Sequence, residues 1–358
     1  MNKVKTAIVG MGIGRVNGKA IENNPRGEVV ALCDLVEERM EEFQQQLDKK
    51  VKFYNDYRKL CSDSGIDAVF VGTPNQNHVE IAREVIRSGK HLLITKPLAD
   101  SLENAQKLVE EVKGADSKLV AMMSLSTRFH PACIFLSEEA ERGEFGELYY
   151  AKASSIRRDG IPLGYCDLHP EETDPDIGFI QKGGGALRDM GVHVLDAAWS
   201  LLGRPKPLGA LGVSGAKFGP EGEKFWEEVE KNIKERYNTD DYSGGFIRCE
   251  GGVGIQVESF WASHHPEEFR VEIFGTEAGA SLRPPELYKS KNGSLQNIDI
   301  KMKTSKSSWD IIAEKFINSI LDGEENPAPI KQGYQVQKML EAVLESSKKG
   351  KEVKIKND

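Results

Sequence analysis

The stretch "KVKTAIVGMGIGRVNGKA", residues 3–20, decides the fold expected for this chain of 358 residues. Lys3 to Val9 is an apolar run of strand length, "GMGIG" interrupts it, and "RVNGKAIENN" then has the pattern of a helix. A strand, a glycine turn and a helix in direct succession open a βαβ unit. The backbone amides of such a turn, together with the positive end of the helix dipole, form a binding site for a pyrophosphate.

The acidic residue that follows the second apolar strand supports this interpretation. The glycines have the spacing G-x-G-x-G, one residue shorter than the usual G-x-G-x-x-G, and glycines also serve plain tight turns. Asp34 ends the strand "EVVALCD", where a carboxylate can bind a ribose 2′-hydroxyl and repel a 2′-phosphate. We therefore predict dinucleotide binding, with NAD favoured over NADP, rather than a surface Asp beside a helix cap. NADP stays an alternative cofactor because of Arg15, since a guanidinium near the adenosine ribose can pair with the 2′-phosphate.

The pattern of apolar segments predicts two domains. Up to about residue 124, short apolar strands alternate with helices, which predicts an α/β domain with a parallel, doubly wound sheet, the Rossmann fold. From about residue 125 the chain becomes rich in alternating strands joined by Gly turns, which predicts an α+β domain with a large, mainly antiparallel open sheet. We thus expect an NAD(P)-binding domain at 1–124 and a second, α+β domain at 125–358, with the C-terminal helix packing back on the first.

Composition excludes several classes of protein. The net charge of −8 argues against a nucleic-acid binder, which concentrates Lys and Arg on one face. No apolar run reaches the length of a membrane span, and the first residues lack the pattern of a signal peptide, so we expect a cytoplasmic protein that does not bind membranes. The five cysteines are scattered without a C-x-x-C pair, so we expect neither a disulfide framework nor a metal site.

A pair of residues in a glycine-led helical segment has the pattern of an acid–base site. In "GGGALRDMGVHVLD", Asp189 precedes His193 by four positions, which places both side chains on one face of an α-helix. An aspartate in that position can orient or charge-tune the imidazole, or both side chains can reach one ligand. A single histidine on an apolar helix is usually a core residue, but the glycines and the partner Asp189 favour function here.

Over its whole length the chain resembles the glucose–fructose oxidoreductase and inositol dehydrogenase family (Gfo/Idh/MocA). The resemblance rests on the order and spacing of several motifs, which are "AIVGMGIGR", "ALCD", "TPNQNH", "KHLLITKPLA", "TRFHP", "GEFGELYYAKA", "GGGALRDMGVHVLD" and "VEIFGTEAGASL". It implies that the cofactor is bound by residues from the strand ends of the first domain, namely Gly10, Gly12, Ile13, Gly14, Arg15, Asp34, Thr73, Pro74, Asn75, His78, Thr95 and Lys96.

The same resemblance implies the catalytic and substrate residues. The family's E-K-P motif places a lysine beside the nicotinamide, and Lys96 with Pro97 has that position here, although Thr95 replaces the glutamate. The D-x-x-x-H signature falls on Asp189 and His193. Oxidation of a secondary alcohol needs a base for the hydroxyl proton and a group that stabilises the developing alkoxide, so His193 is expected as the base and Lys96 as the cation. Asp189 is expected to hold His193 or to bind a sugar hydroxyl.

The substrate is less determined by the sequence. "SSIRRDGIP" resembles a branch that acts on sugars and anhydrosugars, including levoglucosan dehydrogenases, so Arg157 or Arg158 is expected near the substrate, the alternative being a plain surface arginine. Arg128 from "TRFHP" is also expected near the substrate. We predict an NAD(P)-dependent dehydrogenase that acts on a CH–OH group of a sugar, inositol or sugar derivative, assembled as a homodimer or homotetramer. The alternatives are a nucleotide-sugar dehydrogenase and a regulator of the same fold that senses dinucleotide or sugar without turnover.

Overall fold

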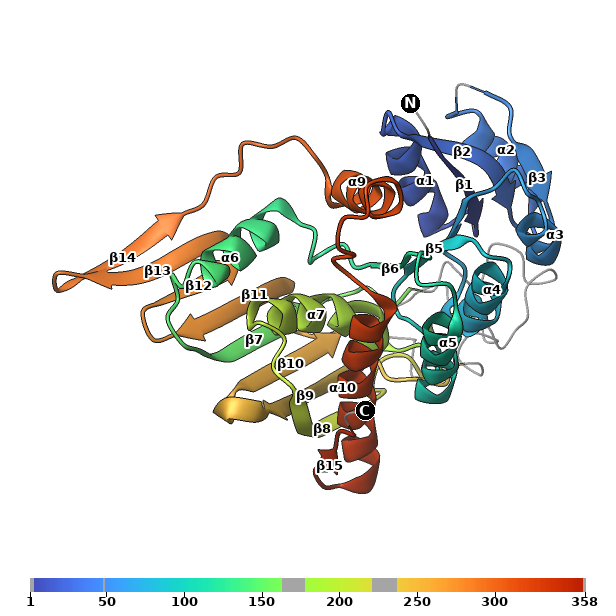
Figure 1. Ribbon diagram of the computed structural model, residues 1–358. Coiled ribbons are helices and arrows are strands. Elements are labelled where there is room, and N and C mark those ends of the chain that lie inside the picture. Colours follow the sequence, from blue (N-terminus) through green and yellow to red (C-terminus); the bar gives the residue numbers. More distant parts are fainter. Residues whose placement is uncertain (1–2, 48, 163–177, 221–236, 357–358) are drawn as a thin grey trace. The chain divides into compact units, whose positions relative to one another are not determined.

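The structure, a computed structural model, describes residues 3–47, 49–162, 178–220 and 237–356 (Figure 1). These residues form two compact units. Unit 1 contains the described residues up to Ser126 and the segment Lys306–Gln335, and unit 2 contains the other described residues from Thr127 onward. The chain therefore leaves unit 1 and returns to it late in the sequence.

Unit 1 is built on a six-stranded sheet in which every pair of neighbouring strands is parallel. The strand order is β3-β2-β1-β4-β5-β6, with the crossover beside β1 that characterises a doubly wound nucleotide-binding sheet. The central strands are buried along nearly their whole length, which explains why their sequences are continuously apolar. The strands are β1 (Val4–Val9), β2 (Gly27–Cys33), β3 (Lys52–Tyr54), β4 (Ala68–Val71), β5 (His91–Thr95) and β6 (Ala121–Ser124). The predicted Rossmann fold is confirmed.

Helices connect these strands and cover the sheet. α4 (Asn75–Arg87) is an amphipathic helix, because its buried residues Val79, Ala82 and Ile86 recur at helical spacing along one face. The late helix α9 (Ser308–Leu321) begins with a capping box in which Ser307 and Asp310 satisfy each other's backbone amides, and it packs beside α1. The other helices of unit 1 are α1 (Ile13–Asn23), α2 (Glu37–Gln44), α3 (Tyr57–Cys61) and α5 (Leu102–Gly114).

Unit 2 is built on a nine-stranded sheet with the order β14-β13-β12-β11-β7-β10-β9-β8-β15. Its neighbours are antiparallel except for β7 and β10, which pair in parallel, so the predicted mainly antiparallel sheet is confirmed. The strands are β7 (Leu148–Ile156), β8 (Pro207–Gly215), β9 (Tyr242–Cys249), β10 (Gly254–Phe260), β11 (Glu268–Gly275), β12 (Ala278–Leu282), β13 (Pro285–Lys291), β14 (Ser294–Asp299) and β15 (Val353–Lys354).

One face of this sheet is covered by helices (Figure 1). Ala151, Ile247, Ile255 and Ile273 point to this side from four adjacent strands and join one apolar core with the helices α6 (Pro131–Glu141), α7 (Val192–Leu201) and α10 (Ile330–Lys349). α7 is preceded by η1 (Leu187–Gly191), one turn of π-helix, and β9 is followed by the short 3₁₀ turn η2 (Glu250–Gly252). Among the described residues, no helix is long and apolar enough to cross a membrane.

Candidate functional site

The glycine turn of unit 1 brings two backbone segments into direct contact. Gly10 has φ +89°, and a Cβ added to it would lie 2.7 Å from the carbonyl carbon and oxygen of Gly72. A Cβ on Gly14 would lie 2.8 Å from the side chain of Ile8. Both positions therefore require glycine, one for its backbone conformation and both for space. α1 begins at Ile13 with no side chain capping its first amides, which leaves the helix N-terminus arranged for an anionic ligand.

Asp34 and Arg15 lie on either side of this turn. The Asp34 carboxylate accepts a hydrogen bond from the Met11 amide at 2.7 Å, so it lies against the glycine turn, as expected in a dinucleotide-binding βαβ unit. The Arg15 guanidinium donates through Nε to the Met11 carbonyl at 2.7 Å and forms an ion pair with Glu42 at 2.8 Å. Because its charge is already matched by Glu42, Arg15 is poorly suited to a 2′-phosphate, which favours NAD.

The turn after β4 contains an unexpected histidine arrangement. His78 is 1% exposed, and its two ring nitrogens lie 2.8 Å from the Pro97 carbonyl oxygen and 2.7 Å from the Thr73 carbonyl oxygen. Burial lowers the pKa of His78, and the nearby charge of Lys96 acts in the same direction, against the two backbone hydrogen bonds. Both ring nitrogens contact backbone carbonyl oxygens, so His78 links the turn of Thr73 to the segment of Lys96. Its expected contact with the cofactor stays a prediction.

Lys96 follows the end of β5, at the carboxyl edge of the parallel sheet. Its side chain is half-buried and Thr95, which stands in place of the family's glutamate, is 5% exposed. The nearby Thr73 hydroxyl is buried and has no hydrogen-bond partner among the described residues. An orphaned buried hydroxyl at this edge, the crowded glycines and Asp34 together fit a bound dinucleotide.

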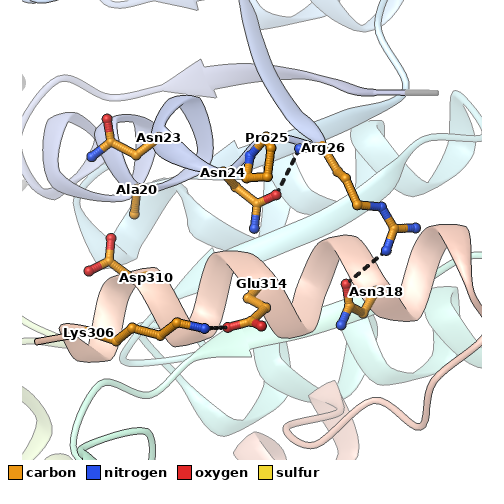
Figure 2. A pocket seen from close by; sticks show the side chains of 9 residues that line it. All are labelled: Ala20, Asn23, Asn24, Pro25, Arg26, Lys306, Asp310, Glu314 and Asn318. Carbon is orange, nitrogen blue, oxygen red and sulfur yellow. Dashed lines mark hydrogen bonds and ion pairs between the residues drawn. The ribbon is translucent and has the colours of Figure 1, made fainter. Parts of the chain in front are cut away.

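Unit 1 also has a groove away from the glycine turn, and its lining does not fit a dinucleotide. A groove of about 520 Å³ lies between the C-terminal end of α1 and α9 (Figure 2). Its basic side chains are paired: Lys306 contacts Glu314 at 2.7 Å, and Arg26 holds Asp322 through two nitrogens. The groove is at the opposite end of α1 from the glycine turn, so it serves the packing of α9 rather than the cofactor.

In unit 2 the predicted acid–base pair spans a change of helix type. Asp189 lies in η1, and His193 is the second residue of α7. Every residue of α7 except His193 is buried, so the histidine is the most accessible side chain of this helix. The sequence pattern indicated one regular α-helix for both residues and did not reveal the π-turn, a feature that often marks functional sites.

Several contacts fix η1 in unit 2. The Asp240 carboxylate accepts the Leu187 amide at 3.1 Å and the Ser243 hydroxyl at 3.0 Å, and burial raises the pKa of Asp240 against these bonds. Arg188 binds Glu341 of α10 through two nitrogens, at 2.7 and 2.8 Å. The segment that presents Asp189 is therefore held from several sides.

The Asp189 carboxylate itself contacts a tryptophan. The indole Nε1–H of Trp261 donates to Oδ2 of Asp189 at 3.0 Å. Trp261 is 0% exposed and Asp189 is 8% exposed. Close by, Arg157 donates to the Gly160 carbonyl and to the Met190 sulfur, both at 3.1 Å, and forms no ion pair with a described residue. Arg157 thus contacts Met190, the residue that follows Asp189, and has no carboxylate partner among the described residues.

Arg128 has a structural partner instead. Its guanidinium contacts both carboxylate oxygens of Asp196, with Nε at 3.1 Å from Oδ2. The side chains of Arg128 and Asp196 are 7% and 1% exposed. The charge of Arg128 thus forms a buried ion pair within unit 2, and its expected contact with the substrate stays a prediction.

Comparisons with known proteins agree with this architecture. Residues 4–123 match the model of an oxidoreductase family with an NAD-binding Rossmann fold, and residues 136–281 match the GFO/IDH/MocA C-terminal domain. The chain belongs to the GFO/IDH/MocA family. It is 27% identical over 332 residues to D-glucoside 3-dehydrogenase of Escherichia coli (strain K12), covering 92% of this chain and 90% of the relative.

Other proteins are also similar to this chain over most of its length. The chain is 26% identical over 316 residues to scyllo-inositol 2-dehydrogenase (NAD(+)) of Bacillus subtilis (strain 168), covering 87% of this chain and 81% of the relative. A structure of levoglucosan dehydrogenase in complex with NADH and levoglucosan superposes with a TM-score of 0.82 at 20% identity, covering 99% of this chain and 100% of that one. The similarity to the levoglucosan dehydrogenase structure shows that the two proteins share a fold.

Sequence reasoning missed three residues around the family's D-x-x-x-H signature. Trp261 and Asp240 lie far from Asp189 in sequence, and Asp196 shares α7 with His193 but faces Arg128. Asp196 carried one signal, since a carboxylate in a continuously apolar helix requires a buried partner.

Proposed function

We propose that this protein is an NAD-dependent dehydrogenase that oxidises a secondary hydroxyl of a sugar, inositol or sugar derivative. The dehydrogenase names of its relatives support the substrate class. The observation that carries the proposal is the position of His193: it is the most accessible residue of the otherwise buried α7, and it follows the anchored Asp189.

In this proposal, His193 accepts the proton of the reacting hydroxyl. A histidine is suited to this step because its ordinary pKa, about 6.5, lies near neutral pH. Asp189 orients the imidazole or accepts a hydrogen bond from a neighbouring hydroxyl of the sugar. Lys96 of unit 1 provides the positive charge that stabilises the developing alkoxide.

The cofactor is bound by unit 1. We propose that the amides of the glycine turn, including Gly10, Gly12, Ile13, Gly14 and Arg15, hold the pyrophosphate, and that Asp34 accepts the ribose hydroxyls. Thr73, Pro74, Asn75 and Thr95 are proposed to line the nicotinamide half, where the buried Thr73 hydroxyl still needs a partner. NAD supplies the hydride acceptor, and the protein supplies alignment and proton transfer.

Arg157 is proposed as a substrate contact. Among the described residues, its guanidinium has only a carbonyl and a thioether as partners, both weaker acceptors than a carboxylate, so it retains hydrogen-bonding capacity for a sugar oxygen. Arg128 is proposed to support the substrate region only indirectly, through its pairing with Asp196.

The proposal is tested by NADH formation with a panel of inositols, aldoses, glucosides, anhydrosugars and nucleotide sugars. Activity with one class, lost by orders of magnitude in His193→Ala while NAD affinity is retained, is the expected result. A protein that binds NAD but is inactive with the whole panel, or a fully active His193→Ala variant, contradicts it.

We also propose that the protein is a homo-oligomer that assembles through the outer face of the unit 2 sheet. Leu211 and Phe246 are cross-strand partners on this face and are 55% and 38% exposed. The ring of Tyr150 stacks on Phe246 and meets Phe274 edge-on, so apolar side chains on this face come from four strands, β8, β9, β7 and β11. An exposed apolar band of this extent is typical of an interface. Light scattering of the wild type and of Leu211→Asp distinguishes an oligomer from a monomer.

A further inference from the structure

The contact between Trp261 and Asp189 joins two residues on different elements. Trp261 follows the end of β10, and its backbone amide donates to the Asp241 carbonyl at 2.9 Å. Its ring belongs to a small apolar cluster with Ile180 and Ala186, and Met190 packs against that cluster. The hydroxyl of Ser259, two residues before the tryptophan, donates to the Ala186 carbonyl at 2.8 Å. The indole is therefore fixed relative to η1 from two sides.

The choice of a carboxylate as acceptor is informative. A buried indole N–H requires an acceptor, and a backbone carbonyl suffices for this purpose. Trp199 of α7 shows this simpler solution in the same unit, because its Nε1–H donates to the Pro205 carbonyl at 2.8 Å. Holding the carboxylate of Asp189 at 8% exposure carries a desolvation cost that a carbonyl does not. Stability alone thus does not account for this pairing.

The indole has the properties that a fixed support needs. It donates one hydrogen bond, accepts none and does not ionise, so it keeps the same role at every pH of interest. With Oδ2 held by Trp261, rotation of the Asp189 carboxylate is restricted. The π-turn at η1 and the bonds from Asp240 set the backbone beneath it.

We propose that Trp261 is a positioning residue for the oxidation, because its indole N–H orients the carboxylate of Asp189 and stabilises its charged form. This inference rests on the proposed role of Asp189 in the reaction. It assigns a function to a residue outside the D-x-x-x-H signature and the cofactor turns, and it makes the loop after β10 part of the acid–base half of the site.

The test compares Trp261→Phe with Trp199→Phe. Each substitution removes one indole N–H and a similar volume from a buried position of unit 2, but only the first loses a bond to Asp189. We expect Trp261→Phe to lower kcat about 10- to 100-fold, the usual effect of losing a hydrogen bond to a charged group, with the KM for NAD changed less than about twofold. Trp199→Phe is expected to keep kcat within about threefold of wild type.

The pH profile separates positioning from a general structural effect. Without the indole donor, more of the negative charge of Asp189 acts on the protonated form of the base His193, so the acidic limb of the kcat/KM profile moves to higher pH in Trp261→Phe and stays in place in Trp199→Phe. If Trp261→Phe folds poorly, benzothienylalanine incorporated at the same position replaces the N–H with sulfur at nearly equal volume, and the same two measurements apply.

Two outcomes distinguish this inference from the function on which it rests. Asp189→Asn with full activity contradicts the role of Asp189 and with it the proposed mechanism. An inactive Asp189→Asn combined with a Trp261→Phe variant that matches Trp199→Phe in kcat and pH profile overturns only the role of Trp261.

Discussion

Replacing Arg128 with methionine is expected to lower the free energy of unfolding of unit 2 rather than to weaken substrate binding. The guanidinium holds both oxygens of Asp196, whose side chain is 1% exposed and has no other hydrogen-bond partner among the described residues. Arg128→Met leaves this carboxylate buried and uncompensated. Breaking a buried pair in this way costs about 3–5 kcal/mol in the free energy of unfolding.

The chain offers a matched control at the surface. Arg248 and Glu352 form an ion pair at 2.8 Å, but their side chains are 56% and 47% exposed. Arg248→Met is therefore expected to cost less than about 1 kcal/mol. A double variant, Arg128→Met with Asp196→Leu, removes both charges and is expected to recover most of the stability lost in the single variant.

Urea unfolding measures these effects, and steady-state kinetics measures the alternative. We expect Arg128→Met to unfold at a markedly lower urea concentration, with the double variant in between and Arg248→Met close to wild type. The reasoning is refuted if Arg128→Met unfolds like wild type while the KM for the sugar rises, because the arginine would then serve the substrate.

Three further predictions concern unit 1. Gly10→Ala is expected to lower NAD affinity at least about tenfold, measured by calorimetry, because the added Cβ collides with the backbone of Gly72. Gly89→Ala is the control, since Gly89 also has a positive φ but no atom lies near its added Cβ. It is expected to cost only about 1 kcal/mol of backbone strain and to keep NAD binding. Asp34→Asn is expected to raise the ratio of NADP to NAD activity about tenfold, since it removes the charge that repels a 2′-phosphate; an unchanged ratio would show that Asp34 does not face the ribose. The pKa of His78 is lowered by burial, so below about pH 6.5 the unfolded chain binds a proton that the folded chain does not, and stability decreases as the pH is lowered. Melting temperatures between about pH 5 and 8 are expected to fall less steeply in His78→Gln, and an identical slope would contradict this assignment.

The sequence by itself determined the parts of this protein that depend on local pattern. Buried strands followed by a glycine turn allow few other folds, because a strand buried on both faces needs helices on both sides. The glycines at Gly10 and Gly14 and the carboxylate of Asp34 indicated a dinucleotide, since their roles depend on neighbours close in the chain. The spacing of Asp189 and His193 indicated an acid–base pair for the same reason.

Only the tertiary structure decided which partners these residues have. Arg128 lies 68 residues from Asp196, and Trp261 lies 72 residues from Asp189. His78 meets the Pro97 carbonyl from a different βα unit. Such pairs form when packing brings distant segments together, and no periodicity in the sequence records which donor will face which acceptor. The sequence therefore predicted which residues carry chemistry, whereas burial and long-range hydrogen bonds determined which of them are held in place and by what.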